Sequence, residues 1–323
     1  MERKQTKIIS VVTILSVFFF YFSSIAFARS NQSNELDVFN KNIHRLYQQG
    51  DYAKALSVAK EAVAYAEKNF GRKSLEAASF YSTLATIYSL NRQYQNSEVF
   101  RLKGLKIIEE AFGPNSPEVA VKLGSLGAHY YSQKKYDMAE EVLKRGLKIL
   151  ESNFGTDSTE LLGLLNNLAV TEVAMGNSES AKKIFLRTVN LYKTHKIMNL
   201  DYAIALRSMA NFYLDKNEFE KAESMLLEII NVYHKLEKKG HPDYADFLSE
   251  LAVFFKNKKE YNLAENCYID SFEIRARVFG YKHNLTQTAY AKLYKFFNDM
   301  GNKSKAAGLK NFMIEKGGFS NTP

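Results

Sequence analysis

The stretch from Gly113 to Gly155, GPNSPEVAVKLGSLGAHYYSQKKYDMAEEVLKRGLKILESNFG, decides the fold of this chain. Apolar residues recur at intervals of three and four over residues 119–133 and 136–153, as amphipathic helices require. Ser116 and Pro117 suit the start of the first helix, because a serine hydroxyl accepts from free backbone N–H groups and the fixed φ of proline fits a first turn. The stretch therefore predicts a helix hairpin whose apolar face needs a neighbour to cover it.

The same layout returns at a nearly fixed interval along the chain. An aromatic residue opens most of the second helices, and Ser178 stands at this place as a weak copy in the fourth pair. A small residue follows three positions after the start of each second helix. Successive small residues are 42, 42, 42, 41, 42 and 42 positions apart: Ala55, Ser97, Ala139, Ala181, Ala222, Ala264 and Ala306. This register predicts an all-α fold, an α-α superhelix (solenoid) of about seven helix pairs, in which stacking covers each hairpin's apolar face.

Recurring short motifs within the first helices carry a family resemblance. A large apolar residue and a small one are followed three positions on by an aromatic: Leu84-Ala85 with Tyr88, Leu126-Gly127 with Tyr130, Met209-Ala210 with Tyr213 and Leu251-Ala252 with Phe255. This pattern resembles the tetratricopeptide repeat. Four further features resemble the 42-residue form of this repeat in kinesin light chain. They are the longer period, helix ends such as Phe154-Gly155, the run LNNLA at residues 165–169, and His241-Pro242-Asp243. The resemblance covers residues 36–316 and implies a protein-binding fold, without naming a partner.

Both ends of the chain lie outside the repeats. Basic Arg3, Lys4 and Lys7 precede an apolar run, and Ala26-Phe27-Ala28 follows at the spacing that a signal peptidase reads. We therefore expect a signal peptide at residues 1–28 and a periplasmic or secreted protein. The alternative is an uncleaved transmembrane anchor, since residues 8–28 are long enough to span a bilayer. Residues 29–35 lack apolar side chains and predict a disordered lead, and residues 317–323 predict a disordered tail.

The charge of the chain is mildly basic. The formal net charge of +9 falls to +7 without residues 1–28, which hold three basic residues and one acidic residue. Lysines and arginines in the turns within the hairpins are offset by acidic neighbours, which favours a solvated rim over a surface for acidic lipid or glycan. No nucleic-acid-binding motif is present. We expect a protein or peptide partner, no nucleic acid, membrane contact only through an uncleaved N-terminal segment, and a monomer.

Residues that carry chemistry are scattered. None of the six histidines pairs with a carboxylate or a second histidine at metal-ligand spacing, and phosphate-binding glycine loops and nucleophile elbows are absent. His241 matches a linker residue of the family and predicts a helix cap, and the lone Cys267 predicts a buried thiol. We therefore expect no enzymatic activity, no cofactor, no metal and no catalytic residue.

The fourth helix pair departs from the pattern. It lacks the Phe-Gly ending, the next interval is one residue short, and Glu172 stands where Tyr88, Tyr130 and Tyr213 stand in other copies. A carboxylate in a packed interface costs several kcal/mol unless it is paired or hydrated. Two interpretations remain: the helix rotates so that Glu172 reaches solvent, or the fourth and fifth pairs form a hinge or a polar pocket.

The expected function is a non-catalytic scaffold that holds a protein segment in the concave groove lined by the first helices. An alternative is a structural subunit of an envelope complex that acts through its convex face or by end-to-end stacking, and a third is an accessory domain for a separate enzyme. In the kinesin light chain pattern the residue matching Asn167 resembles a clamp on a peptide backbone, and Arg207 could contact a ligand carboxylate. The predicted groove residues are Ser82, Thr86, Asn166, Asn167, Arg207, Asn211 and Lys295.

Overall fold

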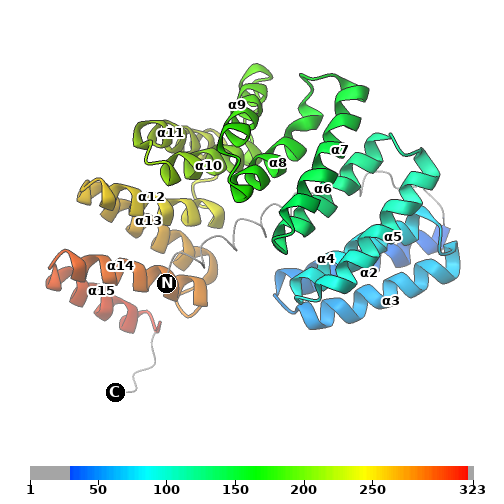
Figure 1. Cartoon of the computed structure of the whole chain (residues 1–323). Coiled ribbons are helices and arrows are strands. Elements are labelled where there is room, and N and C mark those ends of the chain that lie inside the picture. The colour runs from blue at the N-terminus through cyan, green and yellow to red at the C-terminus, as the bar shows by residue number, and fades with distance from the viewer. Residues whose placement is uncertain (1–29, 319–323) are drawn as a thin grey trace. The chain divides into compact units, whose positions relative to one another are not determined.

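The structure, a computed structural model, describes residues 30–318 and their side chains from residue 35 onward. Over this range it contains fourteen α-helices that form seven consecutive antiparallel pairs (Figure 1). The helices fall into two compact units, unit 1 up to Lys196 and unit 2 from Ile197. The predicted all-α solenoid of tetratricopeptide-like pairs is confirmed.

Unit 1 contains four pairs and unit 2 contains three. In unit 1 the helices are α2 (Ser30–Gln48), α3 (Tyr52–Phe70), α4 (Leu75–Leu90), α5 (Tyr94–Phe112), α6 (Pro117–Ser132), α7 (Tyr136–Phe154), the short 3-10 helix η2 (Thr159–Leu161), α8 (Leu162–Met175) and α9 (Ser178–Thr194). In unit 2 they are α10 (Leu200–Asp215), α11 (Phe219–Lys235), α12 (Pro242–Asn257), α13 (Tyr261–Phe279), α14 (Asn284–Asp299) and α15 (Lys303–Glu315).

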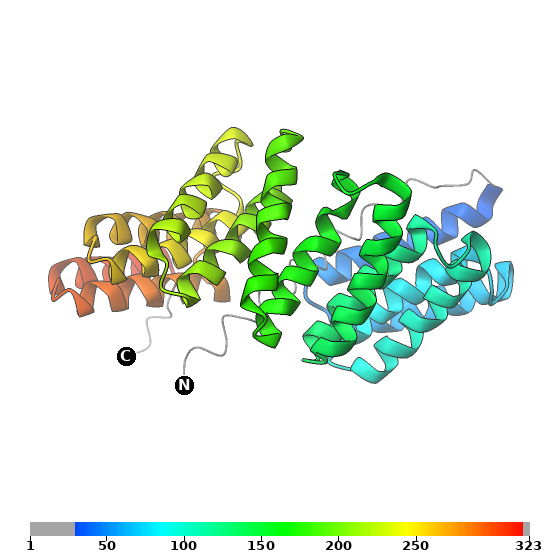
Figure 2. The same cartoon turned by 45° about the horizontal axis from the view of Figure 1, so that its top comes forward.

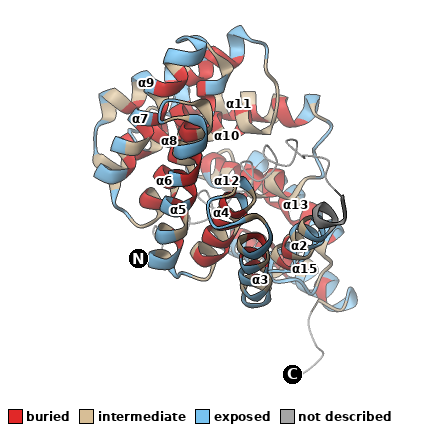
Figure 3. Ribbon diagram, turned by 90° about the vertical axis from the view of Figure 1, so that its right-hand side faces the viewer, coloured by how far each residue is buried: buried red, intermediate tan, exposed pale blue. Residues whose placement is uncertain are grey.

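The small residues that define the repeat register lie at the closest helix contacts. All seven, from Ala55 to Ala306, are buried. Consecutive helices pack against one another within each unit, and in unit 2 α11 meets α12 through the rings of Tyr233 and Tyr244 (Figure 2). Residues on the facing sides of the helices are mostly buried, and residues on the outer sides are mostly exposed (Figure 3). A large side chain at any of the seven positions would push two helices apart, which is why the register is so regular.

Two kinds of turn join the helices, and both need unusual backbone angles. Between α7 and the following loop, Gly155 has φ 83° and ψ 168°, a region that is accessible almost only to glycine. Within each pair one residue takes a left-handed φ at the repeat interval: Gly50, Arg92, Lys134, Gly176, Asn217, Lys259 and Gly301. Glycine fills this place in three pairs, and in the other four a larger residue carries the cost of the left-handed conformation.

The ends of the fold differ from the sequence prediction in one respect. The predicted disordered lead at residues 29–35 is wrong from Ser30 onward, because α2 begins at Ser30 and not at Leu36. Residues 30–35 hold no glycine or proline that would stop a helix from extending. At the other end α15 stops at Glu315, and the carbonyl of Gly318 accepts a hydrogen bond from Gln287 Nε2 at 3.0 Å. The predicted signal peptide and most of the tail lie outside the described residues. In the described part of the chain, no helix is long and apolar enough to span a membrane.

Candidate partner-binding surface

Each first helix presents one narrow strip of side chains that neighbouring helices do not fully cover. We call these residues the first-helix strip of their unit. In unit 1 the strip comprises half-buried or exposed residues on three helices: Ser79, Ser82, Thr83 and Thr86 on α4, Val121, Lys122, Ser125 and Ala128 on α6, and Gly163, Asn166 and Val170 on α8. The strip is mainly polar, and the half-buried carboxylates of Glu76 and Glu118 lie one turn before Ser79 and Val121 on the same faces of α4 and α6.

The predicted site residues on α4 are half-buried and bonded to their own helix. The Ser82 hydroxyl donates to the Ala78 carbonyl and the Thr86 hydroxyl to the Ser82 carbonyl, each at 3.0 Å. Ser82 Oγ also accepts from Lys122 Nζ of α6 at 2.8 Å, which links the strips of two neighbouring helices. Ser82 thus lies on the strip beside Lys122, a residue that the sequence analysis did not name.

The predicted site residues on α8 have polar atoms without partners. Asn167 is only 4% exposed, and its Nδ2 has no hydrogen-bond partner among the described residues. The Oδ1 of the adjacent Asn166 is also buried and without a partner. Buried polar atoms are nearly always bonded in native proteins, and each exception calls for an explanation such as a ligand or an ordered water. Together the two amides leave one donor and one acceptor unsatisfied.

The predicted residues of unit 2 lie in a more highly charged setting. Arg207 Nε of α10 is 3.8 Å from a carboxylate oxygen of Glu250 on α12. Lys295 Nζ of α14 is 3.4 Å from Asp299, and Asn211 is exposed. Since the carboxylate nearest to Arg207 belongs to the protein itself, Arg207 is not a ready receptor for a second one. These residues belong to unit 2, whereas Ser82, Thr86, Asn166 and Asn167 belong to unit 1.

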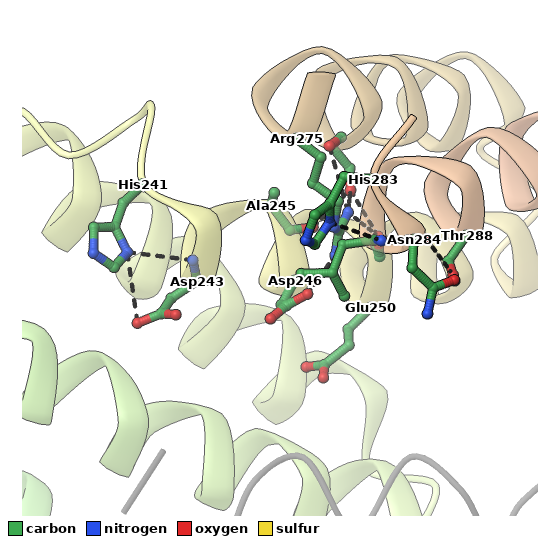
Figure 4. A network of polar contacts seen from close by, with 12 residues as sticks. His241, Asp243, Ala245, Asp246, Glu250, Arg275, His283, Asn284 and Thr288 are labelled. Atoms are coloured by element: carbon green, nitrogen blue, oxygen red, sulfur yellow. Dashed lines mark hydrogen bonds and ion pairs between the residues drawn. The ribbon is translucent and has the colours of Figure 1, made fainter. Parts of the chain in front are cut away.

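A buried polar network connects α12 and α13 in unit 2 (Figure 4). Arg275, which is 6% exposed, donates to Asp246 and to the hydroxyls of Ser249 and Ser271. Ser249 and Ser271 share a hydrogen bond of 2.7 Å. The buried guanidinium thus has a carboxylate of opposite charge, which compensates for the loss of hydration.

Unit 1 contains a second buried arginine in a different setting. Arg101 of α5 is also 6% exposed, and it donates to Ser97 Oγ at 3.3 Å and to Ser125 Oγ. Its Nη2 has no hydrogen-bond partner in the described part of the chain. Burial lowers the pKa of Arg101 to about 10. Burial, and after it the positive charge of Arg101, lowers the pKa of Lys122 to about 8 and that of His129 to about 4.

The structure decides against one of the two interpretations of Glu172. It is 2% exposed, so the interpretation that a helix rotation carries it to solvent is wrong. Helix α8 keeps the repeat register, with Leu165, Leu168 and Ala169 buried, and therefore the side chain stays in the interface. Asn177 Nδ2 donates to it at 2.9 Å, and Lys144 Nζ lies 3.8 Å away. The carboxylate is compensated within unit 1.

The metal-binding potential, the histidine cap and the single cysteine can be described from the structured residues. The described residues contain no group of three or more His, Cys, Asp or Glu side chains that could hold a metal ion. His241 caps α12 as predicted, with its Nδ1 accepting from the Asp243 N–H at 3.2 Å. Cys267 is buried as predicted, and burial followed by the charge of Asp270 raises the pKa of its thiol to about 12. A thiol so far from ionisation is a poor nucleophile at neutral pH.

The last two pairs of unit 2 enclose a cleft of about 780 Å³. Its walls come from α13, α14 and α15 and include Phe272, Leu293, Phe297, Leu309 and Phe312. The lining is mainly apolar, with charged groups such as Glu273 and Lys305 at its margin. The cleft lies where no further pair follows α15 in the described chain.

Comparison with known families agrees with the repeat geometry. Models of the tetratricopeptide repeat match residues 76–152, 118–194, 203–243 and 245–285, which together make up more than half of the chain. The chain belongs to the tetratricopeptide repeat family. Proteins of this family bind protein partners, and the repeat is generally a non-catalytic scaffold. A comparison with curated protein sequences finds no match.

Several solved structures share the fold. A Podosopora anserina putative kinesin light chain with nearly identical TPR-like repeats is 17% identical, with a TM-score of 0.54, covering 65% of this chain and 100% of its own. BtubC (BKLC) from P. vanneervenii is 18% identical, with a TM-score of 0.59, covering 72% and 94%. Aspartyl phosphate phosphatase F from Bacillus subtilis is 14% identical, with a TM-score of 0.60, covering 100% and 88%. The kinesin light chain resemblance is confirmed at the level of the fold.

Proposed function

We propose that this chain is an exported, non-catalytic scaffold that binds an extended protein segment along the first-helix strip of unit 1. The observation that carries the proposal is the pair of buried, unpartnered amide atoms, Asn166 Oδ1 and Asn167 Nδ2, on adjacent residues of α8. A peptide backbone presents one N–H donor and one C=O acceptor per residue, which is the complement of these two atoms. No catalytic role is proposed for any residue.

The chemistry of the neighbouring strip residues supports a polar, extended guest. Ser79, Thr83 and Lys122 add hydroxyl and ammonium groups along α4 and α6. Apolar strip residues are small or few, namely Val121, Ala128 and Val170. Such a surface suits main-chain hydrogen bonding better than insertion of a large apolar side chain. One well-placed hydrogen bond contributes about 0.5–1.5 kcal/mol to binding.

The test begins with crosslinking in the native cell, which identifies the partner, and continues with measured affinities. Replacing Asn166 and Asn167 by alanine should weaken partner binding about tenfold, since two hydrogen bonds are lost. The matched control is Asn190→Ala, because Asn190 is exposed on α9, a second helix, and not on the strip. Unchanged affinity in the strip variant, together with weakened binding when α5, α7 and α9 are altered, would refute the proposal in favour of the outer helices.

Export is proposed from residues 1–28 alone. The basic residues, the apolar run and Ala26-Phe27-Ala28 follow one another in the order of a signal peptide. N-terminal sequencing of the protein from the cell envelope or medium should start at Arg29. An intact Met1 on membrane-bound protein would support an anchor instead, and soluble full-length protein in the cytosol would contradict both.

A further inference from the structure

The two arginines that are buried in the described part of the chain form a natural comparison. Arg101 and Arg275 are each 6% exposed and each bonds two serine hydroxyls. Arg275 also bonds the carboxylate of Asp246. The partners of Arg101 among the described side chains are hydroxyls only, and its Nη2 has none. A buried charge that lacks an opposite charge is costly, so the two sites differ in a way that packing alone does not explain.

A second cation, Lys122, lies near Arg101, while the carboxylate near His129 is Glu98, which accepts hydrogen bonds from Tyr130 and Lys135. The charge of Arg101 is one of the causes that lower the pKa of Lys122 and of His129, so both side chains lie within its electrostatic reach. Lys122 and Ser125 are three residues apart on α6, so they share one face of that helix. Arg101 bonds Ser125, and Lys122 bonds Ser82, which ties both cations to the first-helix strip of unit 1.

We propose that Arg101 and Lys122 form a receptor for one carboxylate group, with Ser82 and Ser125 holding the two cations in place. The unpartnered Nη2 of Arg101 would contact one carboxylate oxygen and the Lys122 ammonium the other. A carboxylate is the ligand that fits, because Nε–H and one N–H of Nη1 are committed to Ser97 and Ser125, and the unpartnered Nη2 together with the Lys122 ammonium matches a group with two oxygens. The carboxylate is either that of a segment docked on the strip, which rests on the proposed function, or that of a free small acid.

The first experiment uses the purified protein and sodium acetate as the probe, with sodium chloride at equal ionic strength as the reference. At pH 7 acetate should move the side-chain Nε–H resonance of Arg101 in a saturable way and leave that of Arg275 in place. At ten times the dissociation constant it should raise Tm by about 3 °C. An Arg101 resonance that does not respond to acetate would overturn the proposal, and this readout requires no variant to fold.

The second experiment compares matched variants. In chloride, Arg101→Met should keep or raise Tm, because it removes an uncompensated buried charge, and acetate should no longer raise it. Arg275→Met should lower Tm by about 5 °C or more, because it leaves Asp246 without its partner, while keeping the acetate response. Equal acetate stabilisation of the wild type and Arg101→Met would overturn the proposal.

A third arm distinguishes the two sources of the carboxylate. The probes are two ten-residue peptides that differ only in having glutamate or glutamine at three positions. If the carboxylate comes from a docked segment, the glutamate peptide alone should displace acetate from Arg101. If neither peptide displaces acetate while acetate still binds, the receptor takes a free small acid. In that case the receptor stands even if the proposed binding of a protein segment to the strip fails.

Discussion

Leu143 of α7 fills the space that a side chain at Gly127 of α6 would occupy. A Cβ atom added at Gly127 would lie 2.5 Å from Leu143 Cγ. From the sequence, we expect Gly127 to lie where helices of neighbouring pairs approach each other closely. In the structure the close contact is within one pair, between α6 and α7. Gly127→Ala should therefore lower the free energy of unfolding by about 1–3 kcal/mol, despite the better helix propensity of alanine.

The control for that prediction is another helical glycine. Gly308 of α15 has no atom within 4 Å of an added Cβ. Gly308→Ala should raise the free energy of unfolding by about 0.5–1 kcal/mol, because only helix propensity changes. Urea denaturation of both variants checks the pair, and two changes of the same sign would show that the α6–α7 contact is not as described.

Replacing Lys134 by glycine should stabilise the folded protein. Lys134 is exposed and has a φ of 62°, at the turn position that glycine occupies in three other pairs. A left-handed conformation costs a non-glycine residue about 1–2 kcal/mol, which is partly offset by the greater freedom of glycine in the unfolded chain. Lys134→Gly should raise the free energy of unfolding by about 0.5 kcal/mol. Lys216→Gly, at a turn residue with φ −95°, should lower it.

His129 should make unit 1 sensitive to mild acid. Its folded pKa of about 4, lowered by burial and then by Arg101, lies below the value of about 6.5 expected in an unfolded chain. Between these values the unfolded state binds a proton that the folded state does not, so the free energy of unfolding falls as pH is lowered from about 6.5 to 4. The loss should reach roughly 2–3 kcal/mol. His129→Phe should flatten the dependence, whereas replacement of the exposed His234 by Gln should not.

Glu172 should matter more to stability than its lysine neighbour. It is buried and accepts from Asn177, whereas Lys144 is 57% exposed and also pairs with Glu140. Glu172→Ala removes a buried hydrogen-bond acceptor from the exposed Asn177 amide and leaves a void in the packed interface of α8, at a cost of about 2–3 kcal/mol. Lys144→Ala should cost under about 1 kcal/mol. Thermal melts of the two variants check the order, and a larger effect at Lys144 would contradict it.

The repeat register predicted the fold, and most helices begin and end within a few residues of the positions that it predicts. It worked because each small residue, such as Ala139, is buried between packed helices, where a large side chain would not fit. The same register also indicates that one polar side chain, that of Arg101, occupies a core position. Arg101 stands where Leu143, Phe185 and Leu226 stand in later pairs, and all three are buried. An arginine at a core position was therefore visible in the sequence.

The sequence could not predict which side chains surround Arg101. A long cationic side chain at such a position can extend to solvent along its apolar stem or stay enclosed. Which occurs depends on the neighbours, here Ser97, Ser125 and Lys122, and on the absence of a carboxylate like Asp246. Likewise, the sequence placed Asn166 and Asn167 on α8, but only the packed structure shows that one polar atom of each is buried without a partner.

A partner bound along the first-helix strip of unit 1 would cover α4, α6 and α8. Amide hydrogen exchange of the protein, with and without the partner identified by crosslinking, should show added protection in these three helices, centred on Ser82, Lys122 and Asn166. No added protection is expected in α5, α7 and α9. Added protection confined to the second helices, or to unit 2, would contradict this binding mode.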